Sequence, residues 1–255
     1  MSDFERAVAF MDELDERSAG RIIPFSHGLA YVDERLPRVH DLNYLRTTRR
    51  GATVDELAAE ADRIQGPLGH RHRRVNFWDR AEAERLEPGF VERGWRPQRF
   101  VVMAHRRDTG RTPNAEAREV DYETLHPIWT AGLMSEPFVK GDRELVRQLV
   151  EHRAVTLRAV PTRFFAAFAD GGVASYCDLY SFDGVGQVEA VLTLPEHRGK
   201  GLASAVVLAA LEASRQAGND LTFLVADADD WPKELYAKLG FETVGRYERF
   251  LLLTE

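Results

Sequence analysis

The sequence predicts a mixed α/β fold that is built twice in tandem, and three observations lead to this prediction. In the second half of the chain, a series of strands is followed by a strand, a helix, a strand, a helix and a strand, an order typical of a mixed sheet. A glycine-rich turn over 198–204 separates an apolar strand from an apolar helix. Residues 90–95 align with residues 236–241, and each segment is followed by a closing apolar strand, which indicates an internal repeat.

The first half of the chain alternates helices and strands. Apolar residues at a spacing of three or four predict helices, and apolar runs or alternation predict strands. In order, we expect a helix over 4–14, strands over 28–32 and 42–46, a helix capped by Thr53 or Asp55 that runs through Ile64, a strand over 75–78, a helix around Leu86 and Phe90, and a strand over 100–103.

A segment of linker composition, 108–117, divides the chain into predicted domains at 1–107 and 118–255. The second domain is expected to hold the active site, and the first to be a degenerate copy. In order, we expect helices over 122–133 and 144–151, strands over 163–168, 173–180 and 187–194 with a hairpin turn over 181–186, a helix over 203–217, a strand over 221–226, a short helix around Leu235 and Tyr236, and a strand over 249–253.

The net charge of −7 is unevenly distributed. Residues 1–112 contain 20 arginines and 19 acidic residues, whereas the remainder contains 14 basic and 22 acidic residues. The acidic half carries the glycine-rich turn, and an acidic cleft attracts a cationic amine. A solvated acidic surface explains the same imbalance, so the charge alone does not decide between the two.

Several classes of protein are not expected. The chain lacks an apolar leader and any run of eighteen apolar residues, so we expect a cytoplasmic protein without a membrane span. Cys177 is the single cysteine, which excludes an intrachain disulfide. The basic run 71–74 is short and lacks interleaved aromatic residues, which argues against nucleic-acid binding. His70 and His72 have no evident further ligands, so we expect a solvated loop there and no metal.

The turn over 198–204 has the chemistry of a pyrophosphate site. Helix N-termini present free N–H groups and the positive end of the helix dipole, and anions bind there. Gly199 and Gly201 allow positive φ and close approach of the backbone. A Walker loop is excluded because its spacing is absent. A dinucleotide fingerprint would need a third glycine where Ser204 stands, but Asp227 keeps this alternative open.

With Tyr236 shortly before Gly240 and Phe241, this turn resembles the acyl-CoA-binding core of the GNAT superfamily of N-acetyltransferases. The resemblance implies tandem GNAT-like folds and acetyl-CoA as co-substrate. The strand before the turn would line the pantetheine arm, and the turn would bind the pyrophosphate. The residues implied to bind acetyl-CoA are Val191, Leu192, Thr193, Arg198, Gly199, Lys200, Gly201, Leu202, Ala203 and Ser204.

The resemblance also implies catalytic roles. Tyr236 would protonate the departing thiolate, since a phenol with a pKa of about 10 carries its proton at neutral pH. Glu189 is the first candidate for the base that deprotonates the amine; the alternatives are Asp178 with Tyr180, and Glu136. The family's usual asparagine seven residues before the tyrosine is Asp229 here, so its pantetheine contact is in doubt.

The first copy departs from the family pattern. Residues 49–53 stand where its phosphate turn belongs but lack the second glycine, and Phe90 replaces the tyrosine. We therefore expect this copy to be a scaffold that shapes the substrate cleft and not a second active site. The alternative is one catalytic domain with an unrelated N-terminal extension.

The sequence as a whole predicts an N-acetyltransferase that transfers an acetyl group to a primary amine by direct attack on the thioester. The acceptor would be a small molecule or a peptide, bound by the region 129–142, and the enzyme a monomer or homodimer. Two rivals stay open. One is a non-catalytic acyl-CoA-binding sensor or scaffold, and the other is a nucleotide-binding enzyme.

Overall fold

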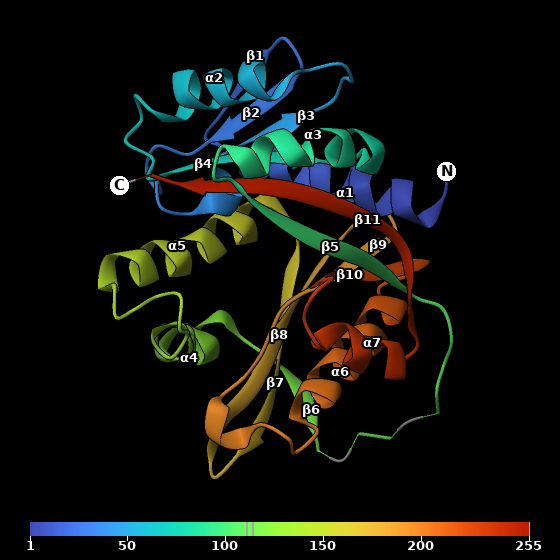
Figure 1. The fold of residues 1–255 in the computed structure, drawn as a ribbon. Coiled ribbons are helices and arrows are strands. Elements are labelled where there is room, and N and C mark those ends of the chain that lie inside the picture. Colours follow the sequence, from blue (N-terminus) through green and yellow to red (C-terminus); the bar gives the residue numbers. More distant parts are fainter. Residues whose placement is uncertain (111, 114, 255) are drawn as a thin grey trace.

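The computed structural model describes residues 1–110, 112–113 and 115–254. Two residues of the predicted linker, 111 and 114, and the terminal residue 255 lie outside this part of the chain. The elements, labelled in Figure 1, are α1 (Asp3–Ser18), β1 (Arg21–Phe25), β2 (Gly28–Val32), η1 (His40–Leu42), β3 (Tyr44–Thr47), α2 (Val54–Gln65), β4 (His72–Phe77), α3 (Arg80–Glu92), β5 (Arg96–His105), β6 (Ala117–Val120), α4 (Tyr122–Met134), α5 (Arg143–Ala159), β7 (Thr162–Ala169), β8 (Gly172–Phe182), β9 (Val185–Thr193), η2 (Pro195–His197), α6 (Leu202–Gln216), β10 (Leu221–Asp227), α7 (Pro232–Lys238) and β11 (Phe241–Leu253).

The described strands form one mixed sheet in the order β1-β2-β3-β4-β11-β5-β10-β9-β8-β7-β6. Strand β3 runs parallel to β4, and β9 runs parallel to β10, while the other neighbours are antiparallel. The order is nearly symmetric about the β11–β5 pair, so the two halves repeat one arrangement. The predicted mixed α/β class is confirmed.

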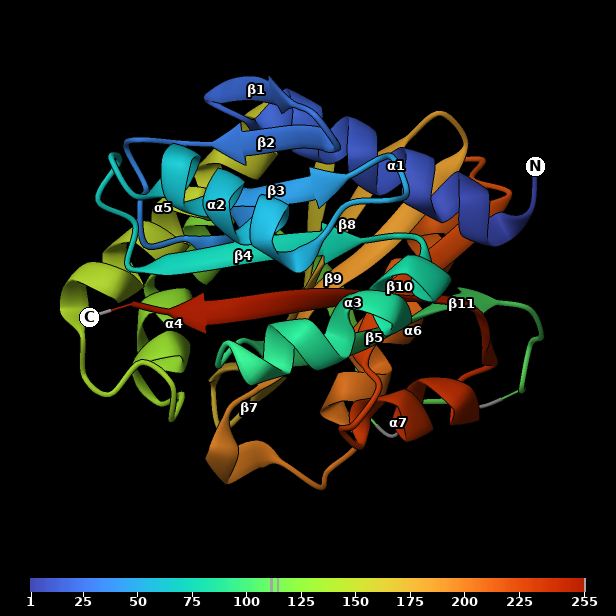
Figure 2. The same cartoon turned by 45° about the horizontal axis from the view of Figure 1, so that its top comes forward.

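The two halves exchange their last strands. Strand β5, from the first half of the chain, pairs with β10 of the second half. Strand β11, from the second half, pairs with β4 of the first half and with β5. Figure 2 shows β11 crossing the molecule beside β4. Each half therefore supplies a strand that completes the sheet of the other half. The division into two domains at 108–117 stays a prediction.

Helices cover both faces of the sheet. On one face, α2 and α3 pack on the first half, in a core that contains Phe77, Phe90 and Phe250, while α6 and α7 pack on the second half. On the other face lie α1, α4 and α5. Successive side chains of a strand point to opposite faces of the sheet. In β5, Val101 and Met103 therefore face α6, whereas Val102 and Ala104 face α1. Among the described helices, none is long and apolar enough to cross a membrane.

Most predicted elements are present, but four features differ. Strand β1 was not predicted, because its apolar run is short and contains a proline. Strand β6 begins at the end of the predicted linker, where its side chains are mostly exposed. Strand β11 starts eight residues earlier than expected, at the Gly-Phe turn. His70 and His72 were expected in a solvated loop, and this was wrong: both are buried, with their rings stacked.

Candidate active site

A bulge in β9 opens the sheet. Ala190 has a φ of 53°, and the register between β8 and β9 shifts around it. Two residues of β9 then stand opposite Cys177 of β8, which bends the strand. Pairing between β9 and β10 stops at Val188 and Leu224, although both strands continue. Beyond this point the two strands diverge around a cleft of about 230 Å³. We call this opening the strand cleft; its walls are residues 188–191, residues 224–227, Pro232 and Tyr236.

A groove of about 560 Å³ lies at the N-terminus of α6 and shares Val191, Pro232 and Tyr236 with the strand cleft. We call it the turn groove. The three-residue helix η2 and the following glycines lead the chain into α6, with φ of 77° at Gly199 and 80° at Gly201. The first N–H groups of α6 have no partner within the helix, as at any helix start. The groove can therefore receive an anionic group on backbone donors.

Nine of the ten residues predicted to bind acetyl-CoA line the turn groove; they are Val191, Leu192, Thr193, Arg198, Gly199, Gly201, Leu202, Ala203 and Ser204. Lys200 is not among the described lining residues, and its Nζ lies 3.5 Å from Nδ1 of His197. The sequence did not point to Trp231, an exposed indole that also lines the groove. Asp229 does not line it, and its backbone N–H donates to Oδ1 of Asp227 at 2.8 Å.

Tyr236 lies where the turn groove meets the strand cleft. It belongs to α7, it lines both spaces, and it is largely buried. Burial, followed by the charge of Glu189, raises the pKa of Tyr236 well above its usual value. The phenol therefore keeps its proton throughout the neutral range.

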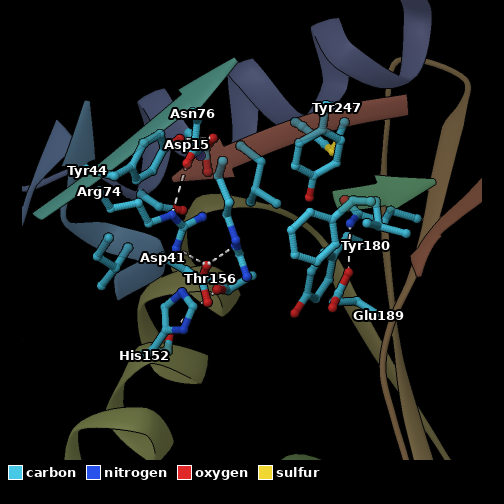
Figure 3. Close-up of a pocket in the computed structure, with 18 of the residues that line it drawn as sticks. Asp15, Asp41, Tyr44, Arg74, Asn76, His152, Thr156, Tyr180, Glu189 and Tyr247 are labelled. Carbon is cyan, nitrogen blue, oxygen red and sulfur yellow. Dashed lines mark hydrogen bonds and ion pairs between the residues drawn. The ribbon is translucent and has the colours of Figure 1, made fainter. Parts of the chain in front are cut away.

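A third space of about 300 Å³, the central cavity, lies between the two halves of the chain. Figure 3 shows side chains from both halves pointing into it. Its floor is the sheet, and α1 and α5 provide the walls. Its charged residues are Asp15, Asp41, Arg74, Glu189, Asp227 and Arg249, and its aromatic residues are Tyr44, Trp78, Phe100, Tyr180 and Tyr247.

Glu189 connects the central cavity with the strand cleft, because it lines both. Nε2 of Gln187 donates to Oε2 of Glu189 at 2.8 Å. Burial raises the pKa of Glu189 to about 7. The carboxylate can therefore accept a proton at neutral pH much more readily than an ordinary glutamate.

The other candidate bases do not line the strand cleft. Asp178 is buried in an ion pair with Arg153 of α5, and it is not among the residues that line the three spaces. Glu136 lines the turn groove, where its carboxylate lies 3.9 Å from Arg198. Tyr180 does line the central cavity, beside Glu189.

The first half of the chain contributes more to the central cavity than the sequence suggested. Of the described residues that line this cavity, none comes from 129–142, where we expected the acceptor to bind. Asp15, Asp41 and Arg74 come instead from α1, η1 and β4. The one sequence signal was weak: Arg74 and Asn76 are polar residues on one face of a strand whose other face is apolar.

Comparison with known proteins identifies the second half of the chain. Residues 125–241 match the Acetyltransferase (GNAT) family. The chain contains a GNAT acetyltransferase domain. This domain runs from α4 to the start of β11, so it includes the turn groove, the strand cleft and Tyr236. GNAT acetyltransferases use acetyl-CoA as co-substrate.

Relatives of this GNAT domain extend the comparison to most of the chain. A mycothiol acetyltransferase from Nocardiopsis dassonvillei is 30% identical over 220 residues, which are 72% of this chain and 65% of that protein. The alignment thus spans just under two thirds of that relative's length.

Two solved structures share the fold. A GCN5-related N-acetyltransferase from Kribbella flavida covers 97% of this chain and 94% of its own, with a TM-score of 0.64 and 19% identity. A tandem GNAT protein from the clavulanic acid biosynthesis pathway covers 82% of this chain and 74% of its own, with a TM-score of 0.53 and 17% identity. The mixed sheet is a GNAT N-acetyltransferase fold.

Proposed function

We propose that this protein is an acetyl-CoA-dependent N-acetyltransferase whose acceptor is a small primary amine. The single observation that carries the proposal is that the three spaces share walls: the strand cleft shares Tyr236 with the turn groove and Glu189 with the central cavity. A donor held in the groove and an acceptor held in the cavity would meet in the cleft, between an acid and a base.

The residues divide the chemistry between them. Backbone groups of 191–193 and the turn at 198–204 hold the donor, with its pyrophosphate at the N-terminus of α6. Glu189 takes a proton from the bound ammonium, and the free amine then attacks the thioester carbonyl. Tyr236 gives its proton to the departing sulfur, or stabilises it by a hydrogen bond. The acetyl group passes directly to the amine, and no protein nucleophile is used.

The size of the central cavity supports a small acceptor. A volume of about 300 Å³ lies at the lower end of the range for small-molecule sites. The cavity is built from both halves of the chain, which supports the proposal that the first half, 1–107, is a scaffold for a site whose catalytic residues lie in 118–255. The relative named mycothiol acetyltransferase supports acetyl transfer as the reaction.

The proposal is tested by calorimetric titration with acetyl-CoA, NAD and ATP, followed by a thiol-release assay with a panel of primary amines. We expect micromolar binding of acetyl-CoA alone and turnover with at least one amine. Absence of acetyl-CoA binding would overturn the proposal. Binding without turnover on any amine would favour the non-catalytic sensor, for which the catalytic pair at the strand cleft has no use.

A further inference from the structure

Two arginines of the central cavity share a single carboxylate. Arg74 on β4 and Arg249 on β11 lie on the same face of neighbouring strands. Oδ1 of Asp41 lies 2.6 Å from Nη1 of Arg74 and 3.2 Å from Nη1 of Arg249. The three groups together carry one excess positive charge.

Each guanidinium is held in place through its Nε atom. Nε of Arg74 donates to Oδ1 of Asn76 at 2.9 Å, and Nε of Arg249 donates to Oε1 of Gln98 at 2.9 Å. Each guanidinium also lies over an aromatic ring. Cζ of Arg74 is 5.0 Å from the ring centroid of Tyr44, and Cζ of Arg249 is 4.2 Å from that of Phe100. Within the described residues, neither Nη2 nitrogen donates a hydrogen bond. Both arginines line the cavity, so the site has oriented donors left for a ligand.

The two guanidinium groups are poorly solvated, although the side chain of Asp41 between them is 60% exposed. The side chains of Arg74 and Arg249 are only 5% and 19% exposed. Burial, followed by the charge of Arg74, lowers the pKa of Arg249. One carboxylate and one arginine would suffice to link η1 to the sheet. A second buried guanidinium is costly unless something else neutralises it.

Within the described residues, no carboxylate other than Asp41 forms an ion pair with either arginine. Asp227, which also lines the cavity, is exposed at the end of β10, and its Oδ1 accepts the backbone N–H of Asp229. Asp15 accepts a hydrogen bond from Tyr44, and burial raises the pKa of Asp15 to about 7, so it supplies only part of a negative charge at neutral pH. His152 faces Asp41 from α5, and burial lowers the pKa of His152, which keeps this imidazole neutral. The carboxylate of Glu189 lies toward the opposite side of the cavity in Figure 3.

We propose that Arg74 and Arg249 bind an anionic group of the acceptor, a carboxylate or a phosphate, so that the acceptor is a primary amine that also carries an acid group. The planar guanidinium groups suit either oxyanion. Bound in this way, the acceptor directs its amine across the cavity toward Glu189. That the bound acid is an acetyl acceptor rests on the proposed function. The anion site itself can be tested by binding measurements without any reaction.

The test compares primary amines in pairs that differ only in the acid group. The pairs are 4-aminobutanoate with 4-aminobutanamide, β-alanine with β-alaninamide, and O-phosphoethanolamine with ethanolamine. Calorimetry measures binding of each compound, and thiol release measures kcat/KM with acetyl-CoA. The first two pairs report on a carboxylate, and the third reports on a phosphate.

Binding and turnover should both respond to the acid group. We expect the protein to favour the acid member of at least one pair by about tenfold or more, as for a charge-assisted hydrogen bond. In Arg249→Gln, the preference for the acid over its uncharged partner should fall to about twofold or less, mainly because KM for the acid rises. Arg249→Lys keeps a positive charge and should retain part of this preference. Arg99→Gln is the matched control, since Arg99 lies on neighbouring β5 and pairs with Glu87 outside the cavity.

The possible outcomes separate the two proposals. Equal binding of both members of every pair overturns the anion site, whether or not the protein acetylates amines. Turnover of amines without any preference for acids leaves the proposed function standing alone. Selective binding of acids without turnover of any amine in the panel supports the anion site and overturns the proposed function. If Arg249→Gln does not fold, the preference of the unaltered protein and of Arg249→Lys decides.

Discussion

Glu189 and Tyr236 line the same strand cleft from two different elements, the bulged strand β9 and the helix α7. Each also lines one further space, the central cavity for Glu189 and the turn groove for Tyr236. After burial, the charge of Glu189 is the next cause of the raised pKa of Tyr236. One group is therefore kept protonated while the other, with a pKa of about 7, can accept a proton.

Replacing Tyr236 with phenylalanine removes the proposed acid with little change in shape. We expect kcat to fall about tenfold or more, because the thiolate would leave without a proton donor. The Kd of acetyl-CoA should change little, since backbone groups hold most of the donor. A thiol-release assay measures kcat, and calorimetry measures the Kd of acetyl-CoA. An unchanged kcat would remove Tyr236 from the mechanism.

Replacing Glu189 with glutamine removes the proposed base and keeps a hydrogen-bond acceptor for Gln187. A base with a pKa of about 7 is active only above that pH, so kcat/KM of the unaltered protein should rise as pH increases through 7. The Glu189→Gln variant should be slower by about a hundredfold at pH 8 and should lack this rise. A variant that keeps the rise near pH 7 would show that another group is the base.

The same substitution should change stability in a pH-dependent way. Burial raises the pKa of Glu189 from 4.5 to about 7, so between these values the folded protein holds a proton that the unfolded chain has lost. The unaltered protein therefore loses stability as pH rises from 4.5 to 7, whereas glutamine cannot ionise. The free energy of unfolding of Glu189→Gln, measured relative to the unaltered protein, should therefore be about 1–2 kcal/mol more favourable at pH 8 than at pH 5. This figure allows for water in the cavity.

Urea unfolding at pH 5 and pH 8 measures this difference. Glu196→Gln, at an exposed glutamate beside the turn groove, is the control for the loss of one carboxylate. If the difference between Glu189→Gln and the unaltered protein is the same at both pH values, the carboxyl of Glu189 is not perturbed by the fold.

The glycine-rich turn before a helix could be predicted because it depends on local sequence, whereas the chemical role of Tyr236 stays a prediction. Gly199 and Gly201 are recognisable from spacing alone, and the structure gives both a positive φ beside the turn groove. Most individual strands and helices follow equally from apolar periodicity. These features depend on neighbours within about ten residues along the chain.

The central cavity could not be predicted because it depends on strand exchange. Arg74 and Arg249 are 175 residues apart in the sequence, and they share Asp41 only because β11 lies beside β4. Nothing in the apolar pattern of 249–253 specifies which strand it pairs with. The bulge at Ala190 was equally hidden, since an alanine at positive φ has no sequence signature.

Replacing Gly201 with alanine tests the turn groove. Gly201 precedes α6 with a φ of 80°, which costs alanine about 1–2 kcal/mol and displaces the turn that would receive the pyrophosphate. We expect the Kd of acetyl-CoA to rise about tenfold. Gly218, with a φ of 82° at the far end of the same helix, provides the control Gly218→Ala. Equal Kd values for the two variants would argue against donor binding at this turn.

Replacing Phe250 with alanine tests whether the halves depend on each other. Phe250 belongs to β11 yet is fully buried in the core of the first half, stacked on Phe90 at 4.5 Å and edge-on to Phe77 at 5.6 Å. Deleting such a ring costs about 3–5 kcal/mol. Because the sheet is continuous, we expect one cooperative urea transition at a lower midpoint for both halves.

Fluorescence of the four tryptophans and circular dichroism follow that transition with separate probes. Leu253→Ala, three residues further along β11 at a side chain that is 56% exposed, is the matched control and should cost less than about 1 kcal/mol. A first half that melts early while the second half keeps its transition would mean that the strands are exchanged without energetic coupling. Coincident loss of both signals would mean that β5 and β11 join the halves into one folding unit, as expected when each half completes the sheet of the other.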